Sequence, residues 1–181
     1  GVSVGTSAFT TAQVDRQANV DVVADDAGLL GLTDGTSGGL VSQDSEGQLG
    51  IDFAAATAGG ANTNALFELG NPDDPTKSQA FNITNNDVES HVIEIDYIAD
   101  SQDSNNEDNL KFDVYDSNGD VLGTISDEGT TASWEASANT DYYVVVTVDT
   151  GHSSGTTVTG TGVDLSGTLS FSIDDTVEGG A

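Results

Sequence analysis

Among the side chains that titrate or bind metals, carboxylates are abundant, whereas His, Lys and Arg are few and Cys is absent. The 181-residue chain has 31 Asp and Glu, two His, three Lys and Arg, and no Cys. Neither His91 nor His152 has neighbours at metal-ligand or triad spacing, and there is no Gly-x-Ser-x-Gly, phosphate-binding loop or His-Glu-x-x-His. Carboxylate pairs arise in any fold of so acidic a chain, so they do not indicate a glycosidase. We predict that the protein is not an enzyme and needs no cofactor.

One segment has the ligand spacing of a calcium loop. Asp116, Asn118 and Asp120 stand at i, i+2 and i+4, and Asp127 falls at the twelfth position. The glycine is at the fourth position, however, whereas an EF-hand needs it at the sixth. A hairpin explains the same residues, because Asn118-Gly119 between strand-like flanks favours a type I′ turn. We predict the hairpin and keep Ca²⁺ at Asp116, Asn118 and Asp120 as the weaker alternative.

A glycosylation sequon is present at Asn82-Ile83-Thr84. In a strand, Asn82 and Thr84 lie on the face opposite Phe81 and Ile83, where an enzyme could reach them on a secreted protein. Asn82 is therefore the candidate glycosylation site.

The net charge of -28 excludes several partners. Nucleic-acid binding needs Lys and Arg to neutralise phosphates, and anionic membranes repel an acidic surface. The acids are spread along apolar-patterned segments and not gathered in a tail, which favours a protein adapted to high salt. At about molar salt the Debye length is roughly 3 Å, so the self-repulsion of such a fold is screened.

The sequence also predicts a location outside the cell. No apolar stretch approaches the roughly 20 residues of a membrane span, so we expect no membrane insertion. The sequence begins at Gly1 without an initiator Met, which fits a product of signal-peptide removal. The absence of a long apolar N-terminal helix argues against a type IV pilin.

Alternation of apolar and polar residues dominates the chain and predicts strands. The clearest example is 163–173, in which Leu169 and Phe171 share one face and Thr168 and Ser170 the other. The segment Tyr142–Val148 differs, because it is apolar on both faces and so predicts a strand buried on two sides. Helical signals are limited to single turns at 27–32 and 64–69. The other alternating segments are 49–53, 81–83, 91–97 and 110–114.

Short strands between turn-rich segments predict an all-β fold, a jelly-roll-like β-sandwich with an extended N-terminal donor strand. We divide the chain into an arm at 1–14, a β-sandwich domain at 15–176 and a short C-terminal tail at 177–181.

Residues 1–14 carry no charged side chain, although acids are frequent in the rest of the chain. Such a β-prone segment on an acidic protein is suited to burial. It could be the first strand of its own domain, or a strand donated to a neighbouring subunit through backbone hydrogen bonds. For the second interpretation, Tyr142–Val148 is the expected acceptor.

Several short segments stand in this order: Gly5-Thr-Ser-Ala-Phe-Thr10, Asp15-Arg16, Val20, Val22, Ala24-Asp-Asp-Ala27, Leu30, Gly47-Gln-Leu-Gly-Ile-Asp-Phe53 and Phe81-Asn-Ile-Thr-Asn-Asn86. They resemble a group of haloarchaeal secreted proteins that are similar to the TasA/camelysin biofilm-matrix proteins and to archaeal bundling pili. The resemblance implies a jelly-roll subunit that polymerises by N-terminal donor-strand complementation. Its donor residues would be Val2, Val4, Thr6, Ala8 and Phe9. The sequence has no zinc-binding motif, so the protease activity described for some relatives is not carried over.

We therefore expect a structural subunit of an extracellular filament, a pilus or biofilm-matrix fibre, whose partners are copies of itself joined head to tail. Lateral bundling of such filaments is a further expectation. The alternative is a monomeric secreted β-sandwich binding module for a surface polysaccharide or cell-envelope partner. Trp134, Tyr142 and Tyr143 would then be its stacking residues, although core packing explains the same aromatic residues.

Overall fold

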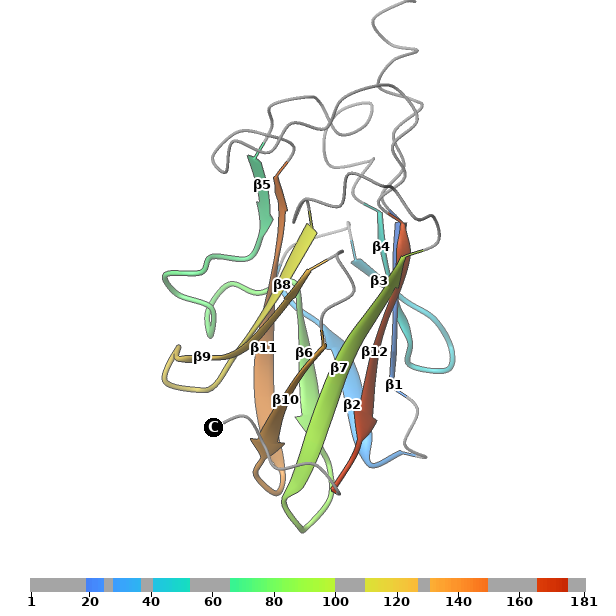
Figure 1. Ribbon diagram of the computed structural model, residues 1–181, viewed down its shortest axis with the longest axis vertical. Coiled ribbons are helices and arrows are strands. Elements are labelled where there is room, and N and C mark those ends of the chain that lie inside the picture. Colours follow the sequence, from blue (N-terminus) through green and yellow to red (C-terminus); the bar gives the residue numbers. More distant parts are fainter. Residues whose placement is uncertain are drawn as a thin grey trace, which may run out of the picture.

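The computed structural model describes residues 19–24, 28–36, 41–52, 66–99, 110–126, 131–149 and 166–175. In this part of the chain all regular structure is β, arranged as two multi-stranded sheets packed as a sandwich (Figure 1). The predicted all-β sandwich is therefore confirmed. No helix long and apolar enough to cross a membrane occurs among these residues.

The two sheets share twelve strands. The first sheet has the order β10-β7-β12-β1-β4-β3, and the second has β2-β6-β11-β8-β9 with β5 also paired to β11. In chain order the strands are β1 Asn19–Ala24, β2 Leu30–Asp34, β3 Val41–Gln43, β4 Leu49–Asp52, β5 Leu66–Leu69, β6 Phe81–Asn85, β7 His91–Ala99, β8 Leu110–Tyr115, β9 Val121–Ser126, β10 Thr131–Ala136, β11 Thr140–Asp149 and β12 Gly167–Ile173.

Strand β1 lies inside the first sheet and fixes where segment 1–18 joins the sandwich. It runs parallel to β12 and antiparallel to β4, so that Val20 is opposite Gly167 and Asn19 is opposite Asp52. The beginning of β1 therefore lies beside the beginning of β12 and the end of β4, at the upper end in Figure 1. Ala24, at the other end of β1, lies near Leu30 of β2.

The core follows the alternation of the sequence. Ile93, Ile95 and Tyr97 of β7 face inward, whereas Glu94 and Asp96 do not. The same holds for Leu169 and Phe171 of β12, Leu49 and Ile51 of β4, and Phe112 and Val114 of β8. Aromatic rings pack edge to face in the centre, as Phe81 does with Phe171 at a centroid distance of 6.1 Å.

Strand β11 explains why one segment is apolar on both faces. Tyr142, Val144, Val146 and Val148 belong to the core, but Val145 points to the opposite side and is still fully buried. The segment between β5 and β6 covers it, since a Cβ atom on Gly70 would lie 3.1 Å from Val145 Cγ2. On the outer face the predicted burial is confirmed at Val145 but not at Tyr143 or Thr147, which are half-buried.

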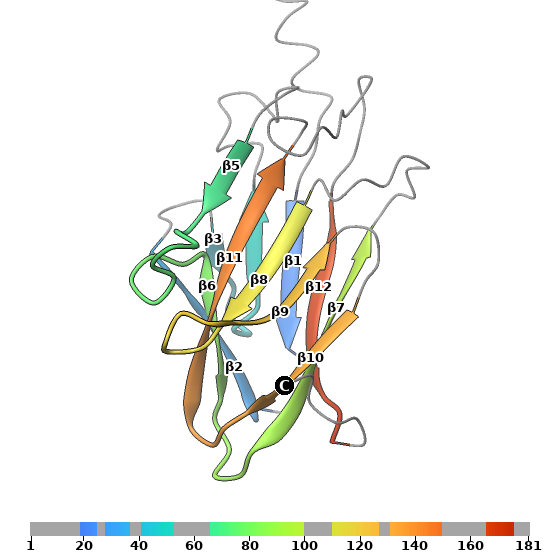
Figure 2. The same cartoon turned by 60° about the vertical axis from the view of Figure 1, so that its left-hand side comes forward.

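The same strand cannot be the acceptor that we expected. On one side β11 pairs with β8, and on the other it pairs first with β6 and then with β5 (Figure 2). Both of its edges are thus occupied within the chain. The prediction failed because apolar faces report burial by packing and carry no information about free backbone edges.

The hairpin at 116–120 is confirmed, but the turn type is wrong. Asp116 N donates to Asp120 O over 3.0 Å, and Gly119 N donates to Asp116 O over 3.0 Å. Gly119 has φ +83°, whereas Asn139 is the only non-glycine residue with positive φ in the described ranges. A type I′ turn needs positive φ at both of its central residues, and neither Ser117 nor Asn118 has it. This is therefore a type I turn followed by a glycine in the left-handed conformation.

The two predicted helical turns are also wrong. Residues 30–32 of the first segment belong to strand β2, and Leu66–Leu69 of the second segment form β5. Leu30 and Leu32 both face the core, as alternation requires, and β2 is bonded along its length to β6. Pairing with a neighbour outweighed local propensity in these short segments.

Candidate functional site

The predicted donor residues Val2, Val4, Thr6, Ala8 and Phe9 lie outside the described residues. So do the boundaries of the predicted arm at 1–14 and of the tail at 177–181. The donor strand and the jelly-roll connectivity therefore stay predictions.

The candidate calcium ligands serve the hairpin turn. Asp116 Oδ1 accepts hydrogen bonds from the backbone N–H groups of Asn118, at 2.9 Å, and Asp120, at 3.0 Å. This carboxylate bonding inside the turn stabilises the type I geometry. In the described part of the chain no three His, Cys, Asp or Glu side chains are arranged so that they could hold a metal ion, and Asp127 lies outside that part.

The sequon residue Asn82 lies on β6 with the predicted facing. Phe81 and Ile83 are buried in the core, while Asn82 and Thr84 are half-buried on the other face. Asn82 Oδ1 accepts a hydrogen bond from Gln79 Nε2 at 3.1 Å. The facing is as expected, and glycosylation of Asn82 remains a prediction.

The aromatic residues considered for ligand stacking are mainly core residues. Trp134 is 2% exposed and Tyr142 is 4% exposed. Their rings pack against each other at 5.6 Å between centroids, and Tyr142 Oη accepts a hydrogen bond from Ser137 N. Tyr143 alone is half-buried, on the outer face of β11. The core-packing interpretation is thus correct for Trp134 and Tyr142.

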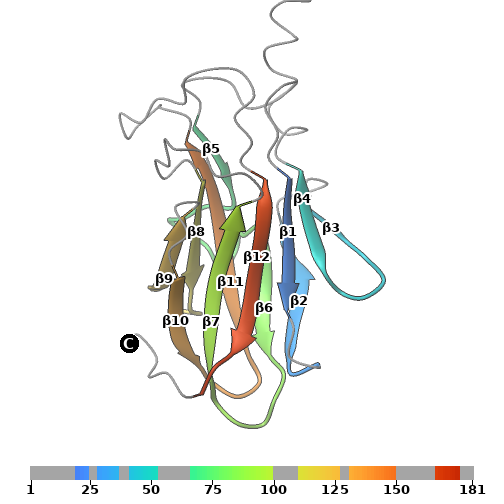
Figure 3. The same cartoon turned by 45° about the vertical axis from the view of Figure 1, so that its right-hand side comes forward.

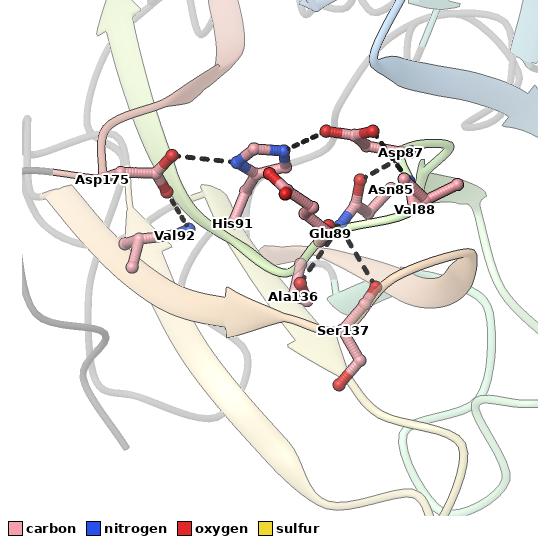
Figure 4. Close-up of polar contacts among 9 residues, drawn as sticks. All are labelled: Asn85, Asp87, Val88, Glu89, His91, Val92, Ala136, Ser137 and Asp175. Carbon is pink, nitrogen blue, oxygen red and sulfur yellow. Dashed lines mark hydrogen bonds and ion pairs between the residues drawn. The ribbon is translucent and has the colours of Figure 1, made fainter.

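A cluster of one histidine and two aspartates joins three parts of the chain (Figure 4). His91, the first residue of β7, lies 2.5 Å through Nε2 from Asp87 Oδ2 and 2.9 Å through Nδ1 from Asp175 Oδ2. Asp175 Oδ1 also accepts the N–H of Val92 at 2.8 Å. The His91 side chain is only 12% exposed. The cluster holds Asp175, the second residue after β12, against the start of β7.

The three groups stabilise one another's charged forms. The hydrogen bond to Asp87, followed by the one to Asp175, raises the pKa of His91 above its ordinary value of 6.5. The hydrogen bond to His91 lowers the pKa of Asp87 and of Asp175 below the ordinary 3.8. These shifts favour an imidazolium between two carboxylates.

Asn85 supports the loop that carries Asp87. This buried side chain of β6 donates through Nδ2 to Glu89 O at 2.9 Å and Ala136 O at 3.1 Å. Its Oδ1 accepts the N–H of Asp87 at 3.0 Å. The sequence offered no signal for this arrangement beyond the four-residue spacing of Asp87 and His91, because Asp175 is 84 residues away.

The cluster is suited to holding segments together and not to catalysis. Both ring nitrogens of His91 are occupied by carboxylates, so neither is available as a base toward a substrate. The two carboxylates beside His91 act as a clamp between the loop that carries Asp87 and the segment that carries Asp175.

Tyr115 on β8 also has a clear titration shift. Its burial, followed by the negative charges of Asp113, Glu68 and Asp73, raises the pKa to about 12. The phenol is therefore neutral at physiological pH and cannot act as a base there.

The outer edge of β2 is the second feature of interest. This strand pairs with β6 on one side, and none of the other described strands pairs with its second side. A groove of about 170 Å³ runs beside it, lined by Ala24, Leu30, Leu32 and the β3–β4 turn at Glu46–Gln48. Figure 3 shows β1, β2 and the β3–β4 hairpin on the same side of the sandwich. An open edge beside a groove with one apolar wall can take up an added strand.

A larger hollow of about 430 Å³ lies on the outside of the first sheet and has a different character. Asp21, Ser42, Asp44 and Thr168 contribute to its lining. It presents carboxylates and hydroxyl groups, without a cationic side chain or a histidine, and it suggests no specific ligand.

No protein-family model matches this chain, and a search of curated proteins finds no significant match.

Proposed function

We propose that the protein is a structural subunit of an extracellular filament, which assembles when segment 1–14 of one copy adds a strand to the sandwich of the next. One observation carries the proposal: residues 1–14 have no charged side chain in a chain of net charge -28. An uncharged β-prone segment loses little by leaving water, whereas acid-bearing strands elsewhere in this chain would bury charge.

The acid distribution on the sandwich supports this contrast. The exposed or half-buried positions of the strands repeatedly carry acids, for example Asp21, Glu94, Asp96 and Glu135. Any strand of this kind would bring carboxylates into a new interface. Segment 1–14 has no charged side chain, so its burial carries no desolvation penalty for a carboxylate.

The mode of assembly would be head to tail. Segment 1–18 joins the sandwich where β1 begins, so a donor segment and an acceptor edge are different surfaces of the same molecule. Contacts between two different surfaces are heterologous, and when the rotation does not close a ring they propagate as a filament. Backbone hydrogen bonds would supply affinity, and pockets for alternate side chains would supply register.

Deletion of residues 1–14 tests the proposal. The full chain in multimolar salt should sediment as polymer and form uniform filaments in electron micrographs, and the deletion variant should remain monomeric. A full-length control with Val4→Asp and Ala8→Asp keeps the chain length but charges the segment, and it should also stay monomeric. Filaments that persist after the deletion would refute donor-strand assembly.

The binding-module alternative gains no support from the structure. Two of its three stacking candidates, Trp134 and Tyr142, are buried. We therefore propose only the filament function.

A further inference from the structure

We propose that the acceptor for segment 1–14 is the outer edge of β2 in a second copy of the chain, beside the groove lined by Ala24, Leu30 and Leu32. This inference rests on the proposed filament function and specifies where the donated strand binds.

The hydrogen-bond pattern of β2 identifies which backbone groups are available. Gly35 N donates to Ala80 O at 3.1 Å, and Asn86 N donates to Leu29 O at 2.8 Å. Because Leu30 of β2 is opposite Asn85 of β6, these bonds place the odd-numbered residues of β2 in hydrogen-bonded pairs with β6. The N–H and C=O groups of the even-numbered residues point the other way, toward the open edge. They belong to Leu30, Leu32 and Asp34.

The groove beside this edge suits the side chains of the segment. Leu30 and Leu32 are nearly buried and face the core, and with Ala24 they give the groove an apolar wall. A strand added to β2 would direct alternate side chains into it. The groove has a volume of about 170 Å³, and the segment carries Val2, Val4, Thr6 and Ala8 in one strand phase.

The other edges of the described sandwich fit less well. Both sides of β11 are paired, and β3 and β5 have only three and four residues. Strands β9 and β10 lie against each other at the corner between the sheets, where Gly123 packs on Ala132. Strand β2, with five residues and an adjoining groove, offers the longest open edge with an apolar wall.

A glutamine side chain occupies the edge within the described molecule. Gln43 Nε2 on β3 donates to Leu32 O at 2.7 Å and to Gly47 O at 3.1 Å. An amide N–H of a donated strand could take the same carbonyl of Leu32. Gln43 would thus satisfy this acceptor until a strand arrives.

The length of the segment allows it to reach a second molecule. β1 runs from Asn19 toward Ala24, which lies beside Leu30, so segment 1–18 joins the sandwich at the end away from Leu30. Eighteen extended residues span about 60 Å at roughly 3.3 Å each, whereas covering the five residues of β2 takes only about 17 Å. The remainder is sufficient to connect neighbouring subunits.

Cysteine cross-linking of the full chain tests the site, because the natural sequence has no Cys. Thr33→Cys places a thiol on the exposed face of β2, and Ser3→Cys, Gly5→Cys or Ser7→Cys places one on the face of the segment opposite Val2, Val4 and Thr6. The control pairs the same three substitutions with Thr131→Cys, on the exposed face of β10.

We expect one of the Thr33→Cys pairs to give a ladder of disulfide-linked oligomers in filaments under mild oxidation, and the Thr131→Cys pairs to give none. Filaments that form normally but cross-link only through Thr131→Cys, or through neither site, would overturn the β2 acceptor and leave the filament function intact. Absence of filaments from the unsubstituted chain would overturn both.

Discussion

The side-chain amide of Gln43 donates a 2.7 Å hydrogen bond to the carbonyl oxygen of Leu32 and so connects β3 of one sheet to β2 of the other. Leu32 O lies on the edge of β2 that faces away from β6. An unpaired strand edge is a template for unwanted pairing, and covering it with a side chain reduces that risk. Gln43 therefore occupies the position at which we place the incoming strand.

Replacing Gln43 with Ala should favour assembly. Loss of the bond to Leu32 O removes a competitor of the donated strand and costs the unassembled sandwich about 1 kcal/mol. We expect a lower critical concentration for filament growth, measured by sedimentation. Ser42→Ala, on the neighbouring residue of β3, is the matched control and should leave it unchanged. A critical concentration that rises in the Gln43 variant would show that this side chain belongs to the filament contact.

The Asp87–His91–Asp175 cluster should give stability a defined pH dependence. Because the folded-state pKa of His91 is raised above 6.5, its contribution is complete below that pH and is lost as pH rises through the raised value. The pKa values of Asp87 and Asp175 are lowered below 3.8, so the contribution of these two groups to stability is complete above that pH. It is lost as pH falls through the lowered values. The cluster therefore contributes most between these two ordinary values.

Denaturant midpoints measured across this range check the cluster. His91→Gln should flatten the decline on the alkaline side, whereas His152→Gln, which changes the other histidine, should retain it. A decline that survives His91→Gln and disappears in His152→Gln would show that the pH dependence does not come from the Asp87–His91–Asp175 cluster.

Gly167 at the start of β12 should not tolerate a side chain. A Cβ atom there would lie 2.5 Å from Ile98 O and 2.5 Å from the Tyr97 ring, so backbone or a buried ring would have to move. We expect Gly167→Ala to lower the free energy of unfolding by about 1–3 kcal/mol. Gly50→Ala in the same sheet is the control, because its Cβ would meet Ser42 Oγ at 3.5 Å, an ordinary contact. Equal losses in both variants would contradict the packing argument.

Alternation predicted strands such as β7, in which one face is buried, but β2 was predicted as a helical turn although Leu30 and Leu32 face the core in the same way. Alternation predicted the inward residues of β7, such as Ile93 and Ile95, since packing imposes a period of two. It could not show that Val145 is covered by the segment after β5, or that both edges of β11 are paired, because these depend on partners distant in the chain. The His91–Asp175 contact was missed for the same reason. The turn at Gly119 was placed correctly, but its type depends on the Asp116 carboxylate.

Salt should stabilise the protein strongly. With a net charge of -28, the folded chain repels itself at low ionic strength, and screening shortens the Debye length from about 10 Å at 0.1 M to about 3 Å at 1 M. We expect the free energy of unfolding to rise steeply with KCl concentration. Glu94→Gln with Asp96→Asn, which neutralises two acids of β7, should reduce the slope. A flat dependence on KCl would contradict adaptation to high salt.

Binding of a labelled peptide of residues 1–14 to the 1–14 deletion variant measures directly whether this segment binds the sandwich of another molecule. Fluorescence anisotropy in multimolar salt should show saturable binding of the natural peptide, and no binding of a peptide with Val4→Asp and Ala8→Asp. If the natural peptide fails to bind a folded deletion variant, or binds no better than the charged peptide, donor-strand assembly is contradicted.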